Sequence, residues 1–294
     1  MYRVGIDLGG TKIEGIILAD NNKEIFRKRI PTEQQKGYQQ IIRNIKTLYD
    51  EAAAYIKNQP HTLGVGTPGA VSKKTGLIKN SNTQCLNNKP MYKDLQKKLG
   101  RGFRLENDAN CFALAEALEG AGKGYRMVFG IIMGTGCGGG IVYEGRVLNG
   151  PQSITGEWGH HTIDPEGNDC YCGKKGCVET YISGTGLENS YQRLTGCKKA
   201  ASEIIKDFHK ADPPAEQCMG LFFNRYGRSV ANLITILDPD IVVIGGGLSN
   251  IRELYTIGRK YVEYNTFNDS LETPIVCNQL GDSAGVHGAA DIGI

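Results

Sequence analysis

Residues 3–18 read RVGIDLGGTKIEGIIL, which is two apolar, alternating runs on either side of a glycine pair. Such alternation interrupted by glycine predicts a β-hairpin with a tight turn. A glycine turn exposes backbone N–H groups to phosphate, and a carboxylate at the end of the first strand can hold Mg²⁺ through water. We therefore predict a phosphate-binding hairpin whose ligand-facing residues are Asp7, Gly9, Gly10, Thr11 and Lys12. For Lys12, a phosphate contact and a solvated position are both open.

The same pattern returns in the second half of the chain. Apolar residues 127–133 and 139–143 flank the turn Gly134-Thr135-Gly136, and a further apolar run, 240–244, ends in Gly245-Gly246-Gly247. An ordinary turn explains each glycine run taken alone. Three such runs at strand ends favour a ligand site, because α/β proteins bind ligands at the carboxyl ends of strands. Two halves that each open on such a hairpin predict a duplicated α/β fold with a cleft between the halves.

The remaining periodicity fits two α/β domains, and 294 residues suffice for two hydrophobic cores. Helical stripes are expected at 34–57, 109–121, 184–195, 200–210, 215–237, 252–265 and 284–292, and strands at 23–30, 63–66, 103–106 and 274–277. We assign residues 1–115 to an N-terminal domain and 116–283 to a C-terminal domain with a loop-rich insert at 150–183. The C-terminal helix, about 284–294, can pack back on the first domain.

Composition excludes several classes of partner. The chain is 40% hydrophobic and 22% charged, with a net charge of +3 and scattered basic residues, so neither nucleic acid nor a membrane surface is expected as a partner. No apolar run approaches the roughly 18 residues of a membrane span. The chain enters a strand at once without a signal peptide, and its nine cysteines are odd in number. We therefore expect a reduced, cytoplasmic protein.

Asp108 lies in Asn107-Asp108-Ala109-Asn110, between a predicted strand and a predicted helix. Taken alone, it is best explained as a helix N-cap, because Asp and Asn favour that position. Its second interpretation is a general base that accepts the proton of a sugar hydroxyl during phosphoryl transfer. The phosphate turns, together with the carboxylates of the insert, favour the second interpretation. We predict Asp108 as the catalytic residue.

The insert carries a compact set of metal-ligand residues, H-x9-C-x-C-x4-C, formed by His160, Cys170, Cys172 and Cys177. Three thiols and one imidazole complete a tetrahedral zinc site with no open position, which is typical of a structural site. A local disulfide with one spare cysteine is the alternative, and His161 is a competing ligand. Two carboxylates, Glu157 and Glu179, flank the set and suit sugar hydroxyls, so zinc would order both.

Together these motifs resemble the ROK family of sugar kinases over essentially the whole chain. The resemblance rests on Asp7-Leu8-Gly9-Gly10-Thr11-Lys12, Gly66-Thr67-Pro68-Gly69, Glu106-Asn107-Asp108-Ala109-Asn110, Gly134-Thr135-Gly136, Gly156-Glu157-Trp158-Gly159-His160, the segment 170–179 and Ile244-Gly245-Gly246-Gly247. It implies the actin-like ATPase (ribonuclease H-like) fold with two α/β domains and an interdomain cleft. It also implies ATP and Mg²⁺, transfer to the 6-hydroxyl of a hexose, and a homodimer.

The resemblance assigns roles to single residues. Asp108 is the general base. Sugar hydroxyls are bound by Gly69, Asn107, Glu157, His160 and Glu179, with one ring nitrogen of His160 for zinc and the other for the sugar. The two glycine turns, residues 7–12 and 134–136, hold the ATP phosphates, and Gly246 and Gly247 lie near the nucleoside.

Within the family, the segments 75–80, 87–90, 170–177, 180–186 and 281–283 look most like bacterial fructokinases of the manno(fructo)kinase type. The expected product is therefore fructose 6-phosphate. Residues 110–114 and 154–157 also look like N-acetylglucosamine kinases, and a glucokinase or mannokinase is a further alternative. A sugar-responsive repressor would need a DNA-binding module before residue 7, where there is no room, and an actin-like ATPase or regulator has no use for Glu157, Glu179 and the zinc set.

Overall fold

The computed structural model describes residues 1–293; residue 294, at the end of the expected C-terminal helix, lies outside the described residues. The chain forms two compact units. Unit 1 contains Met1–Glu119, Gly140–Thr155 and the segment that starts at Asp282, and unit 2 contains Gly120–Gly139 and Gly156–Gly281. This division differs from the expected one at Gly140–Thr155, which belongs to unit 1 because its first residue packs on α3 (Asp108–Leu118).

Unit 1 is built on a five-stranded sheet of order β3-β2-β1-β4-β7. Its strands are β1 (Tyr2–Leu8), β2 (Lys12–Leu18), β3 (Glu24–Pro31), β4 (His61–Thr67) and β7 (Arg104–Asn107). The antiparallel pairing of β1 with β2 confirms the predicted hairpin. Strands β1, β4 and β7 run parallel, so their carboxyl ends share one edge of the sheet.

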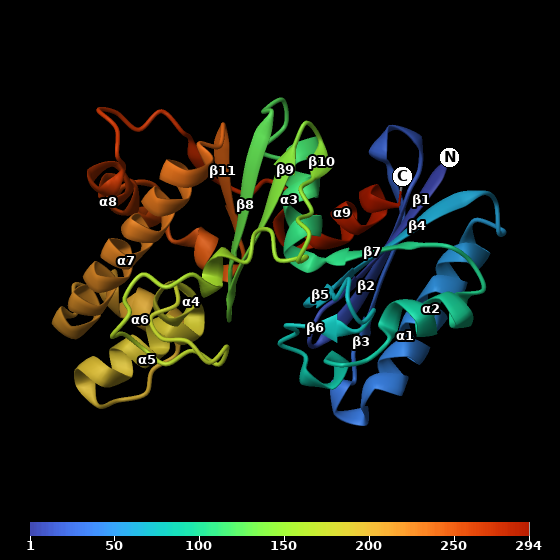
Figure 1. The fold of residues 1–294 in the computed structure, drawn as a ribbon, viewed down its shortest axis with the longest axis horizontal. Helices are drawn as coiled ribbons and strands as arrows, with labels where there is room; N and C mark the ends of the chain where they lie inside the picture. Colours follow the sequence, from blue (N-terminus) through green and yellow to red (C-terminus); the bar gives the residue numbers. More distant parts are fainter. Residues whose placement is uncertain (294) are drawn as a thin grey trace. The chain divides into compact units, whose positions relative to one another are not determined.

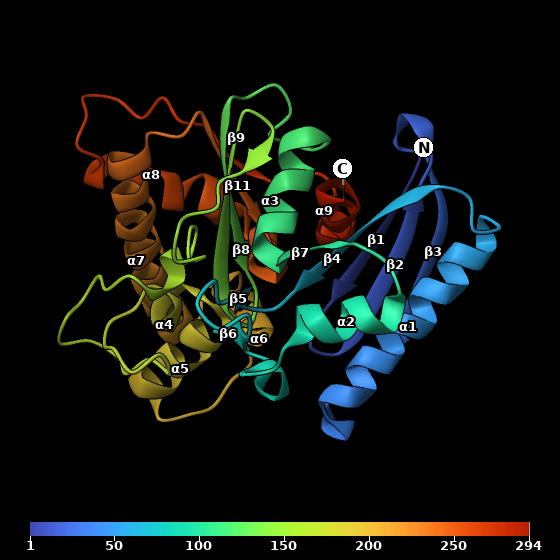
Figure 2. The same cartoon turned by 45° about the vertical axis from the view of Figure 1, so that its right-hand side comes forward.

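Helices cover both faces of this sheet. The helices α1 (Tyr38–Tyr55) and α2 (Met91–Leu99) enclose the larger core, in which Ile41, Ile45 and Leu48 pack on Val4 and Ile6. The other face carries α9 (Ala284–Ile292), which lies beside α3 (Figures 1 and 2).

Helix α9 approaches the sheet closely because β1 and β4 carry glycine where they meet it. A Cβ at Gly64 would stand 1.9 Å from the Ala289 carbonyl oxygen. The C-terminal helix therefore completes the N-terminal unit. Two short strand pieces, β5 (Ala70–Val71) and β6 (Ile78–Lys79), form a separate hairpin after β4.

Unit 2 contains the parallel strands β8 (Met127–Met133), β11 (Ile241–Gly245) and β12 (Ile275–Cys277). Its chain continues into β9 (Cys137–Tyr143), which with β10 (Arg146–Val147) completes a sheet of order β10-β9-β8-β11-β12. The helices of this unit are α4 (Glu179–Ile182), α5 (Gly184–Thr195), α6 (Ala201–Phe208), α7 (Pro213–Leu237) and α8 (Ile257–Asn265). The longest, α7, starts where Asp212 caps it by accepting from the Ala215 N–H.

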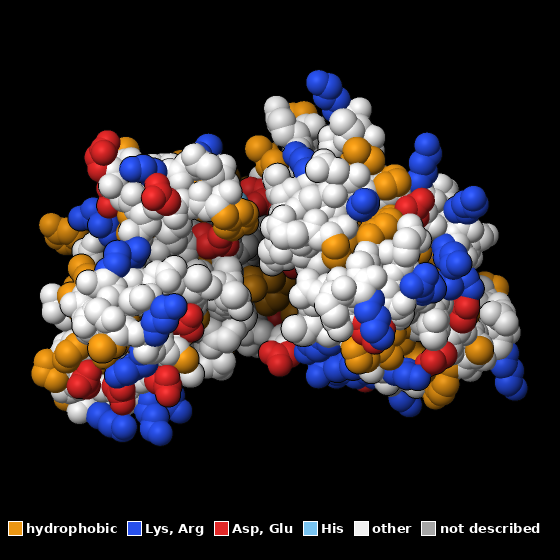
Figure 3. Space-filling model, turned by 90° about the horizontal axis from the view of Figure 1, so that it is seen from below, with side chains coloured by type: hydrophobic (Ala, Val, Ile, Leu, Met, Phe, Trp, Pro, Cys, Tyr) orange, Lys and Arg blue, Asp and Glu red, His pale blue; other side chains and the backbone are white. Residues whose placement is uncertain are grey.

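On the face drawn in Figure 3, Lys and Arg side chains are interspersed with Asp and Glu side chains and form no continuous basic stripe. None of the helices formed by residues 1–293 combines the length and the apolar character that a membrane span requires.

Candidate functional site

The predicted residues of unit 1 gather at the carboxyl edge of its parallel strands. Asp7 at the end of β1 is level with Gly66 of β4, which is in turn level with Glu106 of β7. The chain then continues into Gly69 after β4 and into Asp108 after β7. One edge of the sheet thus carries the predicted magnesium carboxylate, a predicted sugar contact and the predicted base.

The Asp7 side chain is half-buried beside the start of α9, where a Cβ added to Gly285 would be 3.1 Å from its Oδ2. Burial, together with the negative charges of Asp108 and Glu14, raises the pKa of Asp7 to about 7, and the positive charge of Lys12 opposes this rise. Its Oδ1 has no hydrogen-bond partner among residues 1–293. A buried carboxylate oxygen without a donor suits a hydrated Mg²⁺ ion, so the residue fits the predicted metal.

The start of α3 shows whether Asp108 is needed as the helix cap or is left to act as a general base. The N-cap is Asn107, whose Oδ1 accepts hydrogen bonds from the N–H groups of Ala109 and Asn110 at 2.9 and 3.3 Å. The Asn107 amide also donates to the Gly69 carbonyl at 3.2 Å. Asp108 is the first helical residue, and its Oδ1 shares the Ala109 N–H at 2.9 Å. The helix therefore keeps its cap if the Asp108 carboxylate acts on a ligand.

The β1–β2 turn uses part of its own backbone to close. The Gly9 N–H donates to the Lys12 carbonyl at 2.9 Å, and the Gly9 carbonyl accepts from the Thr32 hydroxyl at 2.7 Å. Thr11 and Lys12 are exposed, and Gly10 is half-buried. The tip of the turn is thus the part that faces solvent.

Glu106 is a site residue to which the sequence assigned no role. Its Oε1 accepts from the Asn107 N–H and from the Asn110 amide, each at 2.9 Å. Its Oε2 accepts from the Asn149 amide at 2.8 Å. Glu106, Asn107 and Asn149 adjoin a cavity of about 260 Å³ that is also lined by Gly69. The position of Glu106 directly before Asn107-Asp108 was the available signal.

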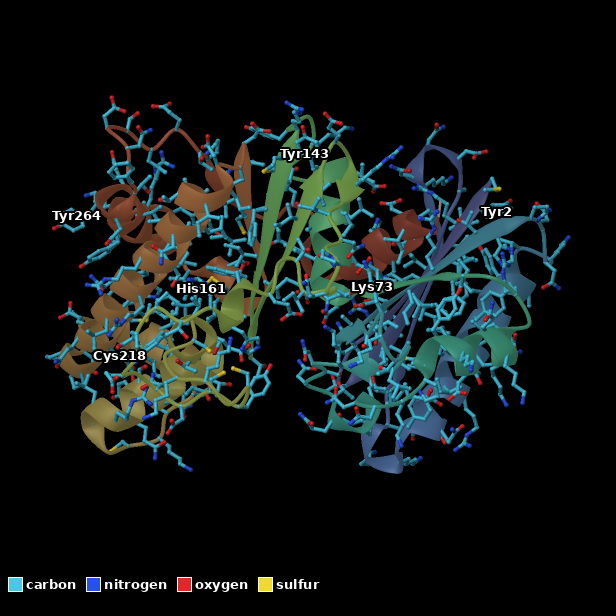
Figure 4. All side chains as sticks on the ribbon, viewed as in Figure 1. Tyr2, Lys73, Tyr143, His161, Cys218 and Tyr264 are labelled. Atoms are coloured by element: carbon cyan, nitrogen blue, oxygen red, sulfur yellow. The ribbon has the colours of Figure 1, made fainter. Side chains whose placement is uncertain are left out.

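The segment after Asn149 is fastened to the same wall of unit 1. Lys73, labelled in Figure 4, donates from Nζ to the Gly150 carbonyl at 2.8 Å. Lys79 donates to the Gln152 carbonyl at 2.7 Å. Two lysines and Glu106 thus hold one side of the cavity in place.

In unit 2, the predicted nucleotide residues meet at the ends of β8 and β11. Gly246 has φ +82, and a Cβ there would lie 2.5 Å from the Met133 carbonyl oxygen, so only glycine fits. The Gly134 carbonyl accepts from the Gly184 N–H at 2.7 Å, which sets the start of α5 against the turn. The residues that this arrangement brings to one edge are Gly134, Thr135, Gly136, Gly246 and Gly247.

Glu179 joins the insert to this turn. It begins α4, and its Oε2 accepts from the Cys137 N–H at 2.8 Å. A Cβ at Gly136 would be 2.7 Å from the same oxygen. Burial of the Cys137 thiol raises its pKa, and the negative charge of Glu179 raises it as well. The predicted sugar carboxylate therefore stands directly beside a predicted phosphate turn.

The predicted metal ligands come together within unit 2. The ligand atoms of His160, Cys170, Cys172 and Cys177 all lie within 4.8 Å of one another. Cys170 Sγ is 3.6 Å from His160 Nδ1, and the Sγ atoms of Cys172 and Cys177 are 3.6 Å apart. A tetrahedral zinc ion with bonds of about 2.0–2.3 Å places its ligand atoms roughly 3.5–3.8 Å apart. The four residues therefore fit zinc, and each of these cysteines is free of a disulfide.

The competing ligand, His161, is engaged elsewhere. Its Nδ1 hydrogen bonds to the Trp158 carbonyl at 2.6 Å, and the Trp158 indole donates to the Gly138 carbonyl at 3.0 Å. His161, labelled in Figure 4, is not among the four clustered residues. The geometry thus selects His160.

The second ring nitrogen of His160 meets a residue that the sequence did not single out. His160 Nε2 lies 3.0 Å from the Tyr171 hydroxyl, and the two rings stand edge to face with centroids 5.2 Å apart. Burial raises the pKa of Tyr171, as do the negative charges of groups that include Glu179 and Glu157. The phenol therefore lies among the predicted sugar-binding groups of unit 2.

The sequence and structure of this chain are similar to those of proteins from one known family. The model of the ROK family matches residues 3–293. The chain is 39% identical to the N-acetyl-D-glucosamine kinase of Mannheimia succiniciproducens over 97% of each chain. Its structure matches a ROK hexokinase of Thermus thermophilus with a TM-score of 0.87 and 32% identity, over 99% of this chain and 97% of the other. The chain therefore belongs to the ROK family, and the resemblance to its sugar kinases is confirmed.

A second solved relative bears on the nucleotide. The ROK glucokinase of Streptomyces griseus, solved with glucose and AMPPNP, has a TM-score of 0.81 and 26% identity and covers 100% of this chain and 99% of its own. These neighbours confirm the actin-like fold. The expected likeness to fructokinases is not supported, because the chain is instead similar to N-acetylglucosamine kinases, among them that of Haemophilus influenzae at 38% identity over 97% of each chain.

Proposed function

We propose that this ROK-family sugar kinase transfers the γ-phosphoryl group of ATP to the 6-hydroxyl of N-acetyl-D-glucosamine. One geometric observation carries the reaction. Asp7 ends the β1 strand and Asp108 directly follows β7, so both lie at one edge of the unit 1 sheet, near enough that the charge of Asp108 raises the pKa of Asp7. A metal-holding carboxylate beside a base is what in-line phosphoryl transfer needs. The substrate rests on the likeness to N-acetyl-D-glucosamine kinases over 97% of the chain.

In the proposed mechanism Asp108 accepts the proton of the attacking hydroxyl. Asp7 would hold Mg²⁺ through water, and the ion, when bound, neutralises charge on the phosphate oxygens. The turns at 7–12 and 134–136 hold the phosphates, and Gly246 and Gly247 lie near the nucleoside. Sugar hydroxyls are bound by Gly69, Asn107, Glu157, His160 and Glu179.

Zinc has a structural role in this proposal. His160, Cys170, Cys172 and Cys177 would hold the ion and leave no position open for substrate. A bound ion would order the segment that carries Glu157 and Glu179, and it would not use Nε2 of His160, the nitrogen that we assign to the sugar. Reduced thiols are required for this ligand set, which fits the proposed cytoplasmic location. We also propose a homodimer, which light scattering of the purified protein would test.

The substrate test is a panel of sugars with Mg-ATP and a readout of ADP release. N-acetylglucosamine should give the highest kcat/KM among fructose, mannose, glucose, N-acetylglucosamine and N-acetylmannosamine, and ³¹P NMR should show a 6-phosphate. No turnover with any of them would contradict the kinase, and a higher kcat/KM for fructose would contradict the substrate.

A further inference from the structure

Tyr171 is held at a fixed point of the insert. It lies between Cys170 and Cys172, two members of the metal cluster, and the N–H of Gly173 donates to the Cys170 carbonyl at 3.0 Å. Its side chain nevertheless remains 66% exposed. A fixed backbone with an exposed ring allows the phenol to change rotamer while the cluster stays intact.

The phenol meets the one ring nitrogen of His160 that the cluster leaves open. His160 Nδ1 faces Cys170 Sγ at 3.6 Å, and Nε2 faces the Tyr171 hydroxyl at 3.0 Å. If Nδ1 binds a metal, Nε2 carries the proton of the neutral imidazole and offers one N–H. A single N–H directed at one point serves one oxygen well, either the Tyr171 hydroxyl or a ligand hydroxyl.

The surroundings of the phenol indicate which ligand competes for that N–H. Tyr171 and His160 belong to the same insert segment as Glu157 and Glu179, the carboxylates that we propose to bind sugar hydroxyls. In this structure the Tyr171 hydroxyl is the group that meets Nε2 of His160.

We propose that Tyr171 is a displaceable plug of the sugar site: its hydroxyl occupies His160 Nε2 in the sugar-free enzyme, and a sugar hydroxyl must expel it in order to bind. The inference rests on the proposed sugar-kinase function and adds a positioning residue that lowers sugar affinity. When the competent state is only partly populated, the apparent Kd rises by the inverse of that population.

The test is Tyr171→Phe, which keeps the ring and removes only the hydroxyl. Without the competitor, the Kd for N-acetylglucosamine, measured by calorimetry without ATP, should fall about three- to tenfold. The KM for the sugar should fall with it, and kcat should stay within about twofold. The control is Tyr264→Phe, since Tyr264 is 87% exposed on α8 and points away from unit 2 at its edge in Figure 4. Zinc content should be the same in all three proteins.

A second measurement follows His160 directly. The ¹⁵N shift of its Nε2 should differ between the wild type and Tyr171→Phe without sugar, and the two spectra should coincide when sugar saturates the site. A Kd that is unchanged or higher in the variant, or spectra that differ equally with and without sugar, would overturn the plug. If the wild type binds no sugar of the panel, the proposed function fails. Sugar binding by Tyr171→Phe alone would then still support the plug. If neither protein binds a sugar, the plug is overturned as well.

Discussion

The two units hold their predicted sugar-binding residues in different ways. In unit 1, Asn107 and Asp108 stand at the junction of β7 and α3, where a parallel ladder and a capped helix fix the backbone. In unit 2, Glu157 and His160 belong to residues 156–178, whose only regular element among the described residues is the 3₁₀ turn Trp158–His160. The first set is positioned by the ordinary fold, whereas the second depends on a local cluster of metal ligands.

This difference implies that a substitution can disable the site residues of one unit and leave those of the other in place. The largest loss of activity should come from a substitution in unit 1. Asp108→Asn removes the base but leaves the Asn107 cap, so kcat should fall by at least about 10²-fold with the fold intact. Asp50→Asn is the matched control, because Asp50 is 53% exposed on α1. Steady-state ADP release with N-acetylglucosamine checks both, and near-normal activity of Asp108→Asn would mean that another carboxylate is the base.

Loss of the cluster should disable unit 2 in a different manner. Cys170→Ser should abolish binding of the roughly one zinc ion per chain. It should also raise the Kd for sugar about 10- to 100-fold, since the hydrogen bonds that Glu157 accepts and His160 donates are lost together. Elemental analysis and calorimetry measure the two effects. The control is Cys197→Ser, an exposed cysteine of unit 2 outside the cluster.

The thermal unfolding of unit 1 should change little in Cys170→Ser, because its core contains no residue of the insert. If zinc is absent from the wild type, the cluster is not a zinc site. If the variant loses zinc but keeps its sugar affinity, the sugar-binding residues of unit 2 do not depend on the metal. They would then be positioned by the protein fold, as those of unit 1 are.

The buried carboxylate of unit 1 predicts a pH-dependent stability. Asp7 has a reference pKa of 3.8 and a folded pKa of about 7, so the folded state binds the extra proton between these values. Stability therefore falls as pH rises from about 4 to about 7 and is level above that. Without Mg²⁺, Asp7→Asn should exceed the wild type in stability by about 1–3 kcal/mol near pH 8, and by less near pH 5.

Urea unfolding at the two pH values measures this difference, with Asp50→Asn as the exposed control. Kinase activity of Asp7→Asn should be lost at the same time, because the magnesium carboxylate is gone. Equal stability of the variant and the wild type at both pH values would contradict the raised pKa of Asp7. It would also contradict the idea that the empty site destabilises the Asp7 carboxylate.

Local pattern was enough to predict most elements that carry the site. Alternating apolar residues and glycine turns predicted both hairpins. The spacing and chemistry of three cysteines and a histidine predicted the cluster of metal ligands. Helix α2 was not predicted, although Met91, Leu95 and Leu99 repeat at four-residue spacing. Its few apolar residues stand among charged ones, so its stability comes from the core it joins rather than from its own sequence.

What sequence reasoning missed depends on contacts between distant residues. Glu106 meets Asn149 across 43 positions, and no periodicity reports such a pair. Tyr171 meets His160 only because the cluster folds the insert back on itself. Taken alone, Asp108 was best explained as the helix cap, but its neighbour Asn107 performs that role, since composition at a helix start does not fix the register. The fructose expectation is not supported either, because the chain is similar to N-acetylglucosamine kinases.

The smallest predicted effect tests whether Glu106 belongs to the scaffold of unit 1 or to its chemistry. Glu106→Gln keeps one acceptor oxygen for Asn107 and Asn110 but turns an amide toward the amide of Asn149, so one hydrogen bond is lost. The KM for sugar should rise about threefold and kcat should barely change, because a net hydrogen bond contributes about 0.5–1.5 kcal/mol. Glu51→Gln, on the exposed side of α1, is the control. A kcat loss as large as that of Asp108→Asn would make Glu106 a second catalytic carboxylate, and unit 1 would then contribute chemistry through a side chain that is now seen only to position its neighbours.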